Sequence, residues 1–127
     1  MAGRSTQSLA VIEHIVSSVF SFLVPCAIIA VVSIPLMVGV VPPNRFYGFR
    51  TRQTLANREV WFRANRFAGW ALFIASVTSA IVFAVHPEYA SGRSIVGLVV
   101  FLVPLVAALV ASFAYLGVIG SGAVDDG

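Results

Sequence analysis

Three stretches of this chain contain no Asp, Glu, Lys or Arg, and they run over residues 15–41, 67–85 and 95–124. A helix needs about 20 mainly apolar residues to cross the hydrocarbon core of a bilayer, so each stretch is long enough. Inside hydrocarbon every backbone N–H and C=O must be paired within its segment, which favours helices. The apolar runs are continuous and lack the alternation of a β-barrel. The sequence therefore predicts an all-α membrane protein with three transmembrane helices.

The composition excludes an ordinary soluble domain. Charged residues make up 10% of the chain and hydrophobic residues 59%, whereas a soluble domain carries about 25% charged residues. A cleaved signal peptide fits poorly, because the first apolar run is too long for one and Arg4 is the only basic residue before it. We therefore expect mature protein from residue 1. Cys26 is the only cysteine, so it forms no internal disulfide, and we expect it to be a packing residue.

We expect a single domain over residues 1–127 that is divided into six segments. These are a first helix over about 9–41, a loop and amphipathic segment over 42–66, a second helix over 67–85, a loop over 86–94, a third helix over 95–119 and a tail over 120–127. Residues 57–66 repeat apolar side chains at helical spacing, with Thr54 or Asn57 as the N-cap. This segment either lies on the membrane or extends the second helix.

The basic charge is concentrated in the first loop. Residues 42–66 hold six arginines against Glu59, a net +5, while the rest of the chain nets −2. Arginine and lysine keep short loops on the cytoplasmic side. We therefore expect the loop and the C-terminus to lie in the cytoplasm and the N-terminus and residues 86–94 to lie outside the plasma membrane.

The loop contains residue types that the orientation of the protein in the membrane does not require. Arg45 and Arg50 carry planar groups of five donors that suit phosphate or carboxylate, and such a cluster at the inner surface favours anionic lipid or an acidic partner. Orientation alone accounts for arginine, but it does not require Asn44 or Gly48 beside it. We therefore expect a recognition site in this loop.

The same residues carry a resemblance to a known family. Pro-Pro-Asn-Arg-Phe-Tyr-Gly-Phe-Arg-Thr at 42–51, Thr-Leu at 54–55, Glu-Val-Trp at 59–61 and Ala-Asn-Arg-Phe-Ala-Gly at 64–69 resemble the SdpI family of small bacterial membrane proteins. The resemblance covers about residues 40–70 and keeps the family's spacing. Arg52-Gln53 and Ala56 depart from it, since the family usually has Pro-Trp and a capping Ser there.

The resemblance implies a polytopic helical membrane protein. The family's named member confers immunity to a secreted peptide toxin and signals by holding a transcriptional repressor at the membrane, with more membrane helices than this chain has. The family pattern transfers to a defined set of positions and implies partner or lipid binding there. These positions are Asn44, Arg45, Gly48, Arg50, Thr51, Trp61, Asn65, Arg66 and Gly69.

Four of these positions also have expectations from their own chemistry. Gly69 lies one turn from Asn65, so it allows a close helix approach across which Asn65 can hydrogen-bond. Arg66 either snorkels to head groups or pairs within the protein. Trp61 alternatively serves as an interfacial anchor.

Other function classes find no support in the sequence. We expect no catalytic residues, because the chain has no nucleophile–base pair, no phosphate-binding Gly-rich loop and no carboxylate inside a span. Glu13, His14, His86 and Glu88 fall near one membrane face without metal-ligand spacing, so we expect no metal and no cofactor. The basic charge lies in one short loop without a binding fold, so we expect no nucleic-acid partner.

The leading hypothesis is a non-enzymatic SdpI-like protein of the bacterial plasma membrane. Its cytoplasmic loop would bind an acidic partner or anionic lipid, in toxin immunity or envelope signalling. The expected partners are membrane lipids and a toxin, a repressor or a subunit of a membrane complex. The alternatives are an accessory subunit of a larger complex and a small transporter or lipid-handling protein that works as a homo-oligomer.

Overall fold

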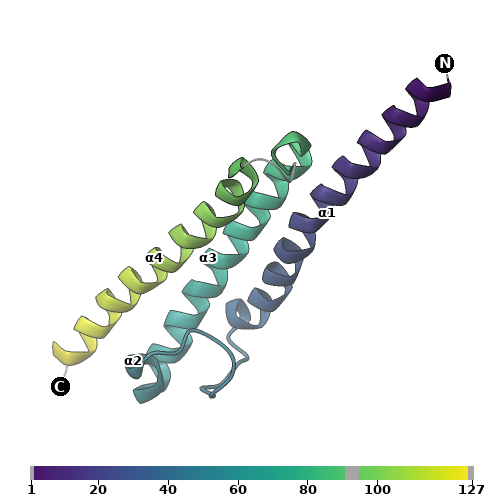
Figure 1. Ribbon diagram of the computed structural model, residues 1–127. Coiled ribbons are helices and arrows are strands. Elements are labelled where there is room, and N and C mark those ends of the chain that lie inside the picture. The colour runs from purple at the N-terminus through teal and green to yellow at the C-terminus, as the bar shows by residue number, and fades with distance from the viewer. Residues whose placement is uncertain (1, 91–94, 126–127) are drawn as a thin grey trace.

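The computed structural model describes residues 2–90 and 95–125, and among these it contains three long helices that lie side by side (Figure 1). The elements are α1 (Ala2–Val38), α2 (Arg52–Ala56), α3 (Arg58–Val85), the 3₁₀ turn η1 (Pro87–Ala90) and α4 (Ile95–Asp125). We call the end of the bundle that carries residues 39–57 the loop end. The opposite end, which carries η1, is the η1 end.

Within the described residues, α1, α3 and α4 are each long and apolar enough to cross a membrane. Their outward surfaces carry large apolar side chains such as Phe20, Ile74 and Leu102, which are exposed in the isolated chain. Such surfaces are favourable when lipid is the solvent. The predicted class, an all-α membrane protein with three spanning helices, is therefore confirmed.

Helix α3 packs against both other long helices. Near the η1 end, Phe83 stacks on Phe22 of α1 with 4.6 Å between ring centroids, and the Ser79 hydroxyl donates to the Val100 carbonyl of α4 at 3.1 Å. Near the loop end, a Cβ on Gly69 would lie 2.8 Å from the Met37 nitrogen of α1. The glycine therefore permits a close approach of these two helices.

The boundaries of α1 and α3 differ from those expected at several points. Helix α1 begins at Ala2, several residues before the expected start, because no proline or glycine pair interrupts the polar segment that leads into the span. It ends at Val38, where Gly39 adopts a positive φ of 81°, three residues before the expected end at residue 41. Residues 58–66 form the first turns of α3 with Asn57 as their N-cap, so this segment extends the second helix.

The expected tail is also largely helical, because α4 continues to Asp125. Residues 91–94 of the second loop, which include Arg93, and residues 126–127 of the tail lie outside the described residues.

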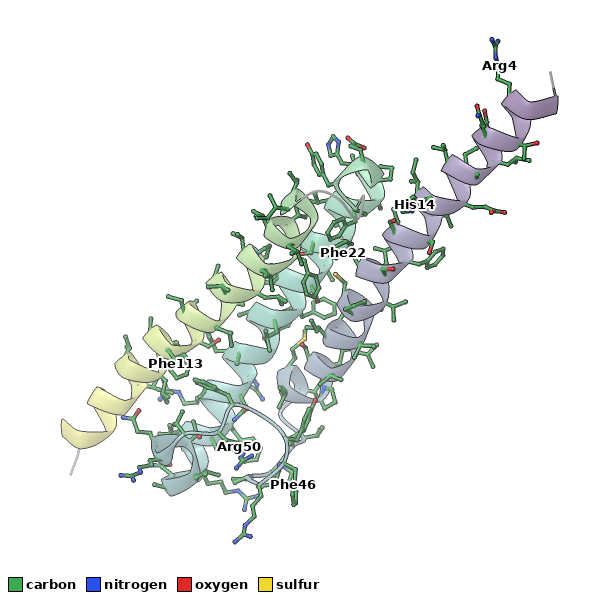
Figure 2. All side chains as sticks on the ribbon, viewed as in Figure 1. Arg4, His14, Phe22, Phe46, Arg50 and Phe113 are labelled. Carbon is green, nitrogen blue, oxygen red and sulfur yellow. The ribbon has the colours of Figure 1, made fainter. Side chains whose placement is uncertain are left out.

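The N-terminal part of α1 extends beyond the η1 end of the bundle, with Arg4 near its tip (Figure 2). Residues 3–17 are all exposed. The whole helix has 37 residues, which corresponds to about 55 Å, against about 30 Å for the hydrocarbon core of a bilayer. Helix α1 is therefore longer than the hydrocarbon core, so either its first turns lie in water or the whole helix is strongly tilted.

Candidate functional site

The connection between α1 and α2 is an ordered loop that folds back against the helices (Figure 2). The indole Nε1 of Trp61, on α3, donates to the carbonyl of Val41 at 2.9 Å. The hydroxyl of Tyr47 donates to the Val32 carbonyl of α1. Burial raises the pKa of the Tyr47 hydroxyl above its usual value.

Asn44 shapes the tip of this loop. Its side-chain oxygen accepts from the backbone nitrogens of Phe46 at 2.9 Å and Tyr47 at 2.7 Å, and its side-chain nitrogen donates to the Pro42 carbonyl at 2.8 Å. Asparagine commonly bonds the backbone two residues ahead in this way. The turn leaves Phe46 93% exposed.

Asn65 holds the far side of the loop. Its oxygen accepts from the Phe49 nitrogen, and its nitrogen donates to the carbonyls of Phe49 at 3.3 Å and Trp61 at 2.9 Å. A Cβ on Gly48 would lie 2.7 Å from the Asn65 oxygen, and Gly48 has a φ of +109°. Only glycine therefore fits at this position without strain.

The loop ends in a capping box. The Thr51 hydroxyl accepts from the Thr54 nitrogen at 3.2 Å and the Thr54 hydroxyl accepts from the Thr51 nitrogen at 2.7 Å, the reciprocal arrangement that starts α2. Thr54 is fully buried. Phe49 packs edge-on against Phe113 of α4 at 4.8 Å between ring centroids, so the loop contacts all three long helices.

Three arginines at the loop end are exposed. Arg45 and Arg50 lie in the loop and Arg52 is the first residue of α2, and no carboxylate of the described residues forms an ion pair with them. Arginine heads that face water remain free for a ligand. The loop end therefore presents three cations on a scaffold that buried side chains fix.

The arginines of α3 have other neighbours. Arg58 lies over the Phe62 ring at 5.6 Å, and Arg63 is 4.0 Å from Glu59. The guanidinium of Arg66 lies against Gly39, where a Cβ would be 2.9 Å from its Nη2. A cation there is favourable because the carboxyl end of a helix carries partial negative charge.

The structure divides the predicted site residues into three groups. Those that build the loop are Asn44, Gly48, Thr51, Trp61 and Asn65. Those that it exposes are Arg45 and Arg50, whereas Arg66 and Gly69 lie at the contact of α3 with the end of α1. Trp61 is 0% and Asn65 2% exposed, so a partner would meet neither of them directly.

Sequence reasoning missed two residues of the loop, Tyr47 and Phe49, which contact α1 and α4. Thr54 was expected as an alternative N-cap, but it lies inside α2, whose N-cap is Thr51. The Thr51–Thr54 spacing was a usable signal for this capping box.

The polar residues at the η1 end form small separate contacts. His86 Nδ1 is 3.0 Å from a Glu88 oxygen, and Ser18 bonds the His14 ring at 3.3 Å. The pKa of Glu88 is lowered, mainly because its carboxylate accepts a hydrogen bond from its own backbone. The hydrogen bond and the charge of His86 lower it further. Among the described residues, no three His, Cys, Asp or Glu side chains gather as a metal site would require.

Three spanning helices and a loop fixed by buried polar residues define a small polytopic α-helical membrane protein with a structured extramembrane connection. The family model described as the SdpI/YfhL protein family matches residues 40–116, from the loop into α4. The chain therefore belongs to the SdpI/YfhL family, as the resemblance over residues 40–70 predicted. Comparison with curated proteins gave no match, and neither did comparison with solved structures.

Proposed function

We propose that this protein is a non-enzymatic membrane protein whose loop binds an acidic segment of a protein partner, with the loop end and the C-terminus in the cytoplasm. The observation that carries the proposal is the outward display of Arg45, Arg50 and Arg52 without carboxylate partners among the described residues. Orientation in the membrane requires positive charge, but it does not require a loop of fixed shape.

The rigid scaffold supports recognition. Ordering a flexible loop on binding costs about 0.5–1.5 kcal/mol for each immobilised side chain. Trp61, Asn65 and Thr54 hold the loop backbone before any partner arrives, which lowers that cost.

The exposed aromatic ring of Phe46, next to Arg45, favours a protein partner over a bare anion. Aromatic and arginine side chains are enriched among the residues that dominate protein–protein binding. The physiological role that we propose is the one implied by the family, toxin immunity or envelope signalling. A contact with another subunit of a membrane complex would use the same surface.

The test is a titration of the protein in phosphatidylcholine nanodiscs with a fluorescent glutamate-rich peptide that contains one apolar residue. We expect saturable binding that weakens with salt, and a loss of affinity of about tenfold or more in Arg45→Gln/Arg50→Gln/Arg52→Gln. The matched control removes the same charge from α3, as Arg58→Gln/Arg63→Gln/Arg66→Gln, and should retain most of the affinity.

Equal peptide binding by the two triple variants would contradict the proposal and would mean that the loop arginines only orient the protein in the membrane. A repeat in nanodiscs with anionic lipid distinguishes the alternative ligand, because lipid that occupies the loop would abolish peptide binding. Native mass spectrometry from mild detergent adds a direct comparison, in which a protein partner should be absent from Arg45→Ala/Arg50→Ala.

A further inference from the structure

A groove lies between side chains of α3 and α4. Its volume is about 500 Å³, within the range of small-molecule sites. Arg63 lies roughly 160° around the helix from Asn65, which holds the loop. The lining residues come from α3 and α4, and they are Phe62, Arg63, Arg66, Phe67, Trp70 and Tyr115.

The groove changes from charged to apolar along α3. Arg63 and Arg66 supply positive charge, and Phe67 stacks on Tyr115 with 4.3 Å between ring centroids. Trp70 follows Arg66 by about one turn, or about 6 Å, in the direction of the uncharged stretch. A phospholipid has the same order of polarity, because its charged head group is followed by an apolar acyl chain.

Neither arginine is held in a strong ion pair within the described residues, so both can bind an anionic ligand. Arg63 and Glu59 are 4.0 Å apart and more than half exposed, and such surface pairs contribute little. Arg66 is exposed, and its guanidinium also lies against Gly39 at the end of α1. Within the part of the chain that the structure describes, it has no carboxylate partner.

We propose that this groove binds an anionic phospholipid of the adjacent leaflet. Its phosphate lies between Arg63 and Arg66, whose planar donors match phosphate oxygens, and the start of an acyl chain lies on Phe67 and Trp70. A phospholipid fits better than an acidic peptide because Trp70 and Ile74, on the same side of α3, are 50% and 58% exposed where the helix enters the membrane. The site uses arginines other than those of the loop, so it goes beyond the proposed function.

Trp70 provides a reporter for this site. The chain has two tryptophans, and Trp61 is fully buried whereas Trp70 is half exposed, so a quencher in the lipid acts mainly on Trp70. The protein is reconstituted in phosphatidylcholine vesicles that contain the same fraction of either brominated phosphatidylglycerol or brominated phosphatidylcholine. We expect brominated phosphatidylglycerol to quench more strongly, with an apparent preference of about tenfold for the anionic lipid.

The variants assign this preference to the groove. Arg63→Gln/Arg66→Gln should abolish it while leaving quenching by brominated phosphatidylcholine, which shows that the variant is inserted and folded. Arg63→Lys/Arg66→Lys should keep part of it because the charge remains. The matched control Arg45→Gln/Arg50→Gln loses the same charge from the loop and should keep all of it.

Two results would overturn the proposal. One is equal quenching of the wild type by the two brominated lipids, and the other is an equal loss of preference in the groove variant and the loop control. Peptide binding by the loop is measured separately, in phosphatidylcholine nanodiscs, so either result leaves that measurement unchanged.

Discussion

The two ends of the helical bundle are held by different kinds of polar contact. At the loop end, Trp61 and Asn65 are almost fully buried and their polar atoms bond the loop backbone. At the η1 end, His86 and Glu88 form a pair that is about half exposed. A buried polar group is costly to leave unpaired, whereas an exposed one can bond water. The shape of the loop therefore depends on Trp61 and Asn65, whereas loss of the exposed His86–Glu88 pair leaves no buried polar group unpaired.

The strongest test of this difference is Asn65→Leu. The change leaves the Phe49 nitrogen and carbonyl without their partner in a crowded site, so we expect a loss of about 3 kcal/mol in the free energy of unfolding. SDS titration followed by circular dichroism measures the free energy of unfolding, and limited proteolysis measures whether the loop remains folded. A loop that remains protected from protease in this variant would contradict the assigned role of Asn65.

A smaller effect is expected from Gly69→Ala, which tests the helix contact beneath the loop. The added Cβ would meet the Met37 nitrogen at 2.8 Å and the Leu36 Cβ at 3.0 Å, and neither backbone can give way easily. We expect a loss of about 1–3 kcal/mol, again by SDS titration. The control is Gly117→Ala, where a Cβ meets nothing within 4 Å, and this variant should lose no stability.

The smallest effect is expected at the η1 end. The pKa of Glu88 is lowered by its own backbone and then by His86, so His86→Gln should move this pKa part of the way back toward 4.5. Carboxyl carbon NMR during a pH titration measures the shift. Because the folded pKa is lowered, the pair stabilises the protein above the unfolded pKa, and this small contribution is lost as the pH falls through the folded value. An unchanged pKa in the variant would assign the shift to the backbone alone.

The long uncharged stretches predicted the three spanning helices, because the bilayer leaves an apolar segment of this length few other structures. The helical spacing of residues 57–66 was also visible, and Asn57 was one of two candidate N-caps, with Thr54. Spacing alone left open whether this segment continues into the span. In the structure it does, and its Val60 and Ala64 form a buried cluster with Leu116 and Ile119 of α4.

The loop conformation was beyond the sequence because it depends on contacts between distant residues. Trp61 had two sequence-based interpretations, recognition and interfacial anchoring, and the structure shows it buried with its nitrogen on Val41. Asn65 was expected to bond a neighbouring helix, but it bonds the loop backbone at Phe49 and the Trp61 carbonyl of its own helix. In both cases the residue type indicated a polar contact, and only the fold decides which partner lies within reach.

The three long helices also differ in proline content. Helix α1 contains Pro25 and Pro35 and α4 contains Pro104, whereas α3 contains no proline along its 28 residues. Proline removes a backbone hydrogen bond and gives a helix a place to bend. Helix α3 therefore has no proline at which to bend along its length of about 42 Å, from Arg58 to Val85. We expect a displacement of its first turns to move the helix as a whole and not to bend it.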